Sequence, residues 1–261
     1  MVALVINSNL SSLNAQRHLE ENRSQLGSSI NRISSGIRIE GASDGGAELT
    51  LTENIRADVL ALQQGSRNLN DGTAFVKTAE GALNEISGIL LRLRSLASQS
   101  ANGTIGDVER ISTDLEYQAS IRELDRIVAT TEFNGTFLLD GTLAASQPDS
   151  AHNVLQLGVD SRSDNQIDLN NILDLTNVGT AALGLTGSNI TTQGAAFQAL
   201  NDLTASIDDL IQVRGRVGTA QIRMLHALDN LQVQEENLNA AVSTIRDADL
   251  AEELTILTKN Q

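Results

Sequence analysis

The sequence contains no cysteine and a single proline, Pro148, among 261 residues. The lack of cysteine excludes disulfide frameworks, thiolate catalysis and sulfur-ligated metal sites. Aromatic residues make up 2% of the chain, whereas hydrophobic residues as a whole make up 40%. This reliance on Leu, Ile, Val and Ala favours long helices packed side by side over a globule whose core depends on aromatic side chains.

Positive charge is scarce, and long hydrophobic runs are missing. The 18 Lys and Arg residues against 33 Asp and Glu residues give a formal net charge of -15, which disfavours binding to nucleic acid or to an anionic membrane. No stretch approaches the roughly 20 apolar residues that cross a bilayer. The first residues, "MVALVINSNLSSLN", lack the basic and apolar regions of a cleavable signal peptide. We therefore expect a cytosolic protein, or one exported by a route without such a signal.

Signatures of catalysis are missing as well. His18, His152 and His226 lie far apart in the sequence, and none belongs to an HExxH motif or a pair at metal-ligand spacing. The segment "EGASDGG" lacks the GxxxxGK[ST] order of a phosphate-binding loop. Acidic pairs such as Asp208-Asp209 are sequence neighbours, which diverge on a helix and form solvated charge. The sequence predicts no enzyme, no metal site and no cofactor.

Apolar residues repeat at helical spacing along most of the chain. A coiled-coil-like seam near the N-terminus has spacings of 7, 4, 3 and 4 and consists of Leu19, Leu26, Ile30, Ile33 and Ile37. Glycines in "SSGIRIEGASDGG" interrupt it. A second seam runs from Ile55 to Ala97, and a third runs from Leu203 through Val242 to Ile245. These seams predict a mainly α protein, an elongated antiparallel helical bundle in which the two chain ends run alongside each other.

The middle of the chain changes character. A shorter helix is predicted over residues 107–129, with Asp107 as its N-cap; its main apolar positions are Ile111, Leu115, Ile121, Leu124 and Ile127. Residues 131–196 contain the turn signals Asn134-Gly135 and Asp140-Gly141 and the partly alternating segment "NVLQLGVD". We interpret this region as short strands and turns, a small β-hairpin region attached to the bundle.

The segment "LLRLRSLASQSANG", residues 90–103, carries two organised stripes. On a helical projection one stripe forms the core face, and it consists of Leu83, Ile86, Leu90, Leu93 and Ala97. A separate ridge consists of Glu85, Ile89, Arg92, Leu96 and Gln99. This ridge is either a partly solvated flank or a contact surface for another molecule, because arginine beside aliphatic residues is common at interface anchors.

Several long motifs resemble bacterial flagellin. In chain order they are "LSSLNAQRHL", "RISSGIRIEGASDGG", "SRNLNDGTAFVKTAEGALNEI", "EFNGTFLLDG" and "NLNAAVSTIRDADLAEE". The hook–filament junction protein shares this terminal architecture, but the "NDG…EGALNEI" run resembles filament flagellin more. The resemblance implies a short flagellin without large variable outer domains. Residues 1–42 and 243–261 would form inner coiled-coil segments, and residues 43–242, including 131–196, the outer helical bundle.

The resemblance also implies a function and partners. The subunit would polymerise with itself into a secreted, extracellular filament for motility, after export by the flagellar type III apparatus. Hook-associated junction and cap proteins would be further partners. Flagellins continue past "LAEELTILTKNQ" with an apolar helical stretch that completes the inner coiled coil and binds an export chaperone. We therefore expect the chaperone site to be missing from this chain.

In flagellins the helix of the second stripe packs axially against the next subunit, and a Toll-like innate receptor recognises the same surface on free monomers. The family's key arginine and leucine correspond to Arg92 and Leu96, and its key glutamate corresponds to Glu116. Ser95 replaces an acidic residue often found before the leucine. The predicted contact residues are Glu85, Ile89, Arg92, Leu96, Gln99 and Glu116. An alternative function is that of a surface adhesin that binds a ligand through residues 140–196.

Overall fold

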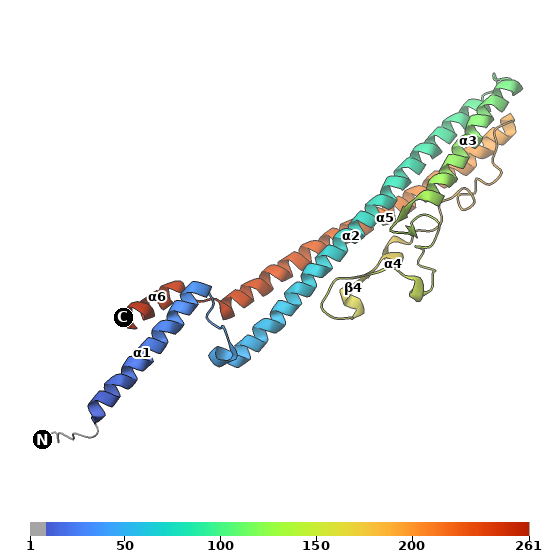
Figure 1. The fold of residues 1–261 in the computed structure, drawn as a ribbon. Coiled ribbons are helices and arrows are strands. Elements are labelled where there is room, and N and C mark those ends of the chain that lie inside the picture. Colours follow the sequence, from blue (N-terminus) through green and yellow to red (C-terminus); the bar gives the residue numbers. More distant parts are fainter. Residues whose placement is uncertain (1–8, 261) are drawn as a thin grey trace. The chain divides into compact units, whose positions relative to one another are not determined.

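The computed structural model describes residues 9–260 and divides into two compact units, each described here by itself (Figure 1). One unit comprises Met1–Leu60 and Gln234–Gln261, and the other comprises Ala61–Val233. The helices are α1 (Leu10–Ser35), α2 (Ala42–Ala101), α3 (Asp107–Thr130), α4 (Leu169–Leu173), α5 (Gln193–Arg246) and α6 (Leu250–Asn260). The predicted mainly α fold with a small strand region is confirmed.

Helices α2 and α5 run antiparallel in the unit Ala61–Val233. The Arg214 guanidinium lies 2.8 Å from Oε1 of Glu80, and Gln193 Nε2 donates to the carbonyl of Ala101 at 3.1 Å. Residue numbers thus rise along α2 as they fall along α5, and Figure 1 shows the two helices side by side. Antiparallel neighbours at this spacing are typical of helical bundles.

The core of this unit is a continuous seam of small and aliphatic side chains. On α5 the buried positions alternate at spacings of three and four, and they are Ala196, Ala199, Leu203, Ser206, Leu210, Val213, Val217, Ala220 and Met224. On α2 the predicted core face is confirmed, since Leu83, Ile86, Leu90, Leu93 and Ala97 are all 0% exposed. Such spacing keeps one face of each helix against its partner along the whole seam.

Helix α3 buries different residues from those that its aliphatic positions suggested. Ile111 and Leu115 are 54% and 68% exposed, whereas Arg110 and Tyr117 are almost fully buried. These polar groups tolerate burial because they are hydrogen-bonded: Arg110 donates to the carbonyls of Asn102 and Ile105 at 2.9 and 3.1 Å, and Tyr117 contacts Ser188 Oγ at 2.8 Å. A core face defined by aliphatic residues alone is therefore wrong for α3.

The start of α3 also differs from the expectation. Gly106 occupies the N-cap position without a side-chain cap, and Asp107 is the first helical residue. The carboxylates of Asp107 and Glu109 lie in the first turn, where negative charge stabilises a helix through its dipole. Asp107 supports the helix start by charge rather than by capping.

The predicted β-hairpin region consists of two small antiparallel sheets. Strands β1 (Glu132–Phe133) and β2 (Thr136–Phe137) flank Asn134 and Gly135, whose φ angles of 50° and 80° suit a tight hairpin turn. Strand β3 (Val154–Gln156) pairs with β4 (Gln166–Asp168). The single-turn 3-10 helices η1 (Asp149–Ala151) and η2 (Ser163–Asn165) precede β3 and β4.

A glycine of α2 lets the β region approach the helix. A Cβ built on Gly65 would lie 2.0 Å from the backbone oxygen of Leu157. Nearby, Asn68 Nδ2 donates to the carbonyl of Gln156 at 2.8 Å. The end of β3 is therefore held directly against the backbone of α2, at a distance that only glycine permits.

We predict that Gly65→Ala destabilises the protein by about 1–3 kcal/mol, because the new methyl group forces the Leu157 backbone away from α2. Gly81 lies in the same helix with open space around its Cβ position. Gly81→Ala should instead stabilise the helix by about 0.5–1 kcal/mol, since alanine is the better helix former. Urea unfolding followed by circular dichroism measures both, and equal effects of the two changes would contradict the close approach at Gly65.

In the other unit the two ends of the chain run alongside each other, as predicted. Helices α1 and α6 pack together, with Arg32 Nη1 3.1 Å from Glu253 Oε1 and Asn260 Nδ2 3.3 Å from Gln25 Oε1. The pairing is antiparallel, because the numbers rise on one helix as they fall on the other. The segments after α1 and α5 also join, through a bridge between Ile37 and Asp247.

The N-terminal seam is less buried than its spacing suggests. Helix α1 ends at Ser35, and Gly36 follows in the left-handed region with φ 73°, so Ile37 lies beyond the helix. The buried residue of α1 is Ser29. The aliphatic seam positions are half-buried at Leu26, Ile33 and Ile37, and 57% and 48% exposed at Leu19 and Ile30.

The C-terminal members of the predicted seam lie on a different helix from the partner of α1. Val242 and Ile245 are half-buried in the last turns of α5, whereas α1 packs on α6. A turn at residues 247–249 separates α5 from α6. The pairing of α1 with α6 therefore includes the Arg32–Glu253 ion pair rather than Val242 and Ile245.

Candidate assembly surface

The structure brings Arg92 of α2 and Glu116 of α3 together. Arg92 Nε donates to Oε1 of Glu116 at 3.0 Å, and its Nη2 contacts the same oxygen. The two side chains are 57% and 50% exposed. An ion pair this exposed contributes at most about 1 kcal/mol to stability. The pair is therefore a surface feature that joins two helices, and it is available to another molecule.

The other predicted contact residues divide into surface and core. Glu85 and Gln99 are exposed and Ile89 is half-buried, but Leu96 is only 2% exposed. The predicted contact residue Leu96 therefore lies in the core of the described chain. Arg92 and Leu96 are one helical turn apart, and Arg92 reaches α3. This side of α2 faces α3, and Leu96 is buried on it.

We predict that Leu96→Ala lowers the free energy of unfolding by about 2–5 kcal/mol, as truncation of a buried leucine does. Leu91 lies on the same helix but is 55% exposed. Leu91→Ala should change stability by no more than about 0.5 kcal/mol. Thermal unfolding of the two variants provides the comparison. A small loss of stability in Leu96→Ala would contradict the burial of this side chain.

Helix α3 carries an apolar stripe on the side away from its core. Val108, Ile111 and Leu115 are 81%, 54% and 68% exposed. Their spacings of three and four place them on one face, whereas Tyr117 and Leu124, two of the four buried residues of α3, point to the opposite side of the helix. In the sequence, Tyr117 and Leu124 are seven residues apart and fall on the side of the helix opposite to this stripe. A list of aliphatic positions alone does not separate the two sides, because it leaves out Tyr117.

A second apolar stripe follows the outer side of α5. Its members are 52–61% exposed, and they are Phe197, Ile211, Ile222, Leu225 and Val233. At about 100° per residue they fall within a sector of about 80°, on the side of α5 away from its buried seam. Exposed apolar side chains aligned along helices are typical of surfaces that another chain covers.

Two other kinds of feature were absent from the described residues. Among residues 9–260, no group of three or more His, Asp or Glu side chains is arranged to hold a metal ion. Within the same range, no helix is both long and apolar enough to cross a membrane.

Two family models match the chain. Residues 6–144 match the bacterial flagellin N-terminal helical region, and residues 198–261 match the bacterial flagellin C-terminal helical region. The chain belongs to the bacterial flagellin family. It is 37% identical to a flagellin of Halalkalibacterium halodurans over 256 residues, which cover 98% of this chain and 90% of that protein.

Solved structures agree with this assignment. The crystal structure of Bacillus cereus flagellin is 30% identical, has a TM-score of 0.54, and is matched over 67% of this chain and 94% of its own. A putative flagellar hook-associated protein from Vibrio parahaemolyticus has a TM-score of 0.61 over 78% of this chain and all of its own, at 17% identity. The second likeness concerns the fold alone.

Flagellins are structural proteins rather than enzymes, and their homologues form the extracellular flagellar filament. This flagellin is accordingly a filament subunit that polymerises with copies of itself. Its length of 261 residues fits a short form without a large outer domain.

Proposed function

We propose that this flagellin contacts the next subunit of its filament through the α2–α3 face, which we define as Glu85, Ile89, Arg92, Gln99 and Glu116 together with Val108, Ile111 and Leu115. The observation that carries the proposal is the apolar stripe of α3, which faces away from a complete core. Covering apolar surface is the dominant favourable term in protein association. Arg92 and Glu116 then form a polar edge beside this stripe, a composition common at interfaces.

Charge sets a condition on assembly. Each subunit carries a formal net charge of -15, so copies repel one another at long range. Salt screens this repulsion over about 8–10 Å at physiological ionic strength, whereas the apolar contact does not depend on charge. Filament growth is therefore favoured by moderate salt.

Residues 1–42 and 243–261 are proposed to form the inner coiled-coil layer of the filament, with residues 43–242 as the outer bundle. Residues 1–8 and Gln261 lie outside the described part of the chain. The support is the exposure of apolar side chains on the terminal helices, namely Leu10, Leu13, Leu19, Ile30, Leu250 and Leu254. Neighbouring subunits would cover these residues, which couples ordering of the ends to assembly.

The family relationship also supports proposals about export and partners. Export by the flagellar type III apparatus fits a cysteine-free chain, which cannot form disulfides before it is exported. Hook-associated junction and cap proteins would bind at the filament ends. The exposed Arg92–Glu116 pair would be recognised on free monomers by a Toll-like receptor, with Ser95 weakening that contact relative to an acidic residue.

We predict that Arg92→Asp reduces filament growth by tenfold or more, because it places a second carboxylate beside Glu116 at the proposed contact. The change should cost little folding energy, since the ion pair that it removes is exposed. The matched control is Arg126→Asp on α3, where an equally exposed arginine pairs with Glu123. Electron microscopy and sedimentation of filaments, with circular dichroism to verify folding, measure the effect. Receptor signalling by the same monomers tests the second partner.

Normal filament growth by a folded Arg92→Asp variant would contradict the proposed contact. The two alternatives give different results from the wild-type chain. A hook–filament junction protein would not grow long filaments on its own, and an adhesin would bind a glycan or host protein through residues 140–196 without polymerising. Formation of long filaments by the purified chain excludes both.

A further inference from the structure

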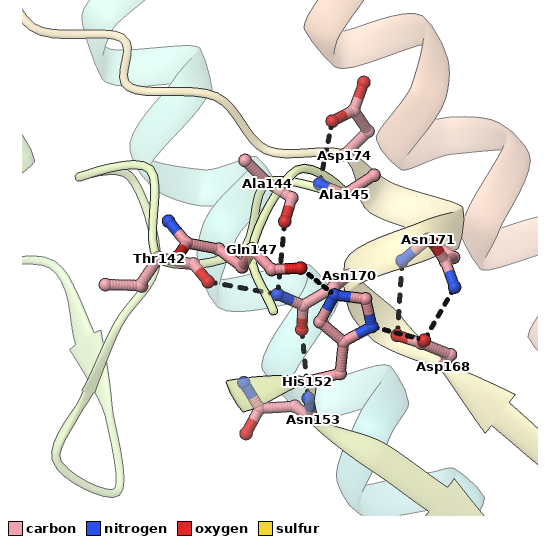
Figure 2. Close-up of polar contacts among 10 residues, drawn as sticks. All are labelled: Thr142, Ala144, Ala145, Gln147, His152, Asn153, Asp168, Asn170, Asn171 and Asp174. Carbon is pink, nitrogen blue, oxygen red and sulfur yellow. Dashed lines mark hydrogen bonds and ion pairs between the residues drawn. The ribbon is translucent and has the colours of Figure 1, made fainter. Parts of the chain in front are cut away.

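A buried histidine joins two segments of the β region. The side chain of His152 is 4% exposed and lies between Asp168 and the loop before η1. Its Nδ1 is 2.6 Å from Oδ2 of Asp168, and its Nε2 is 3.0 Å from the backbone oxygen of Gln147. Figure 2 shows the ring held between these two oxygens.

Both partners of the ring accept hydrogen bonds. The Gln147 carbonyl carries no proton to donate. Asp168 is the N-cap of α4 and already accepts from Asn171 N at 3.2 Å and from Asn171 Nδ2 at 2.7 Å, as an ionised carboxylate does. A neutral imidazole has one donor and one acceptor nitrogen, whereas the imidazolium has two donors. The site is therefore complete only when His152 is protonated.

The charges around the ring favour the same state. The hydrogen bond to Asp168 raises the pKa of His152 above 6.5, burial opposes this shift, and the Gln147 carbonyl and the negative charges of Asp168 and Asp149 raise it further. The carboxylates come from β4 and from η1, so both sides of the site stabilise the cation.

The ring connects a loop to a corner of the fold. Gln147 belongs to the loop that leads from β2 to β3, and Asp168 lies where β4 meets α4. Asn170 spans the same gap, since its Nδ2 donates to the carbonyl of Thr142 at 3.0 Å and its Oδ1 accepts from Asn153 N at 3.0 Å. His152 is the member of this network whose charge changes near neutral pH.

We propose that His152 is a proton-operated clamp that closes the loop 142–153 on the β4–α4 corner when its ring is protonated and releases the loop when the proton is lost. When Nε2 loses its proton, the Nδ1–H group can still donate to Asp168. The lone pair of Nε2 then faces the Gln147 carbonyl oxygen. Two acceptors in contact repel each other, so the loop separates from the ring at Gln147. The clamp makes this part of the flagellin sensitive to the pH of the surrounding medium.

The direction of the pH dependence follows from the raised pKa. Stabilisation by a group whose pKa is higher in the closed state is fully present below its ordinary pKa of about 6.5, and it is lost as pH rises through the closed-state pKa. Between these two values the opening equilibrium rises by up to about tenfold per pH unit, because one proton is released.

The test is a ¹⁵N NMR titration of the imidazole rings in the full chain. We expect His152 to keep both ring protons to a pH above the ordinary imidazole pKa of about 6.5, and amide-exchange protection in residues 147–153 to fall over the same pH range. Titration of His152 at or below 6.5 would overturn the proposal, as would protection that stays constant across its titration.

Asp168→Asn provides the variant. Asp168 uses Oδ1 for the N-cap bond to Asn171 N and Oδ2 for the His152 ring. Asparagine has a single side-chain oxygen and can keep only one of these two bonds, and it removes the negative charge in either orientation. We expect the His152 titration to move back toward 6.5 and the pH dependence of loop protection to move with it. Asp160→Asn, which removes a carboxylate paired with Asn165 and Arg162 elsewhere in the β region, should leave both unchanged. An unshifted titration in Asp168→Asn would contradict the clamp.

Discussion

The structure depends on the burial of one aliphatic seam between two long antiparallel helices. Leucine, isoleucine, valine and alanine repeat along α2 and α5 at spacings of three and four, and the two helices keep a constant register from Glu80–Arg214 to Ala101–Gln193. With aromatics at 2%, stability has to come from the length of this seam rather than from a few large side chains. Helix α3 and the β region then pack onto a framework that is already defined.

The same constraint explains why apolar residues remain on the outside. A helix in a bundle buries one face, and the buried face of α3 includes Tyr117 and Leu124. The stripe of Val108, Ile111 and Leu115 on its other side has no partner within the described chain. The proposed subunit contact accounts for these exposed apolar side chains, because a neighbouring copy would cover a surface that a monomer would keep polar.

Sequence periodicity predicted the long helices well, because a repeat sustained over many turns has few alternatives. The turn at Asn134-Gly135 was also predictable, since both residues need positive φ. Burial was mispredicted where polar residues occupy the core. Arg110, Tyr117 and Ser29 are buried because of specific hydrogen bonds or a close helix partner, and neither is visible in a hydrophobic pattern. A projection of α2 alone could not decide between a flank and a contact surface for Leu96, because it does not include α3.

Electron cryomicroscopy of filaments grown from this chain shows which surfaces neighbouring copies bury. We expect Val108, Ile111 and Leu115 to be buried against a neighbouring copy, with Arg92 and Glu116 at the edge of that contact. A filament map in which the α3 stripe faces solvent, and the copies meet through other surfaces, would contradict this expectation.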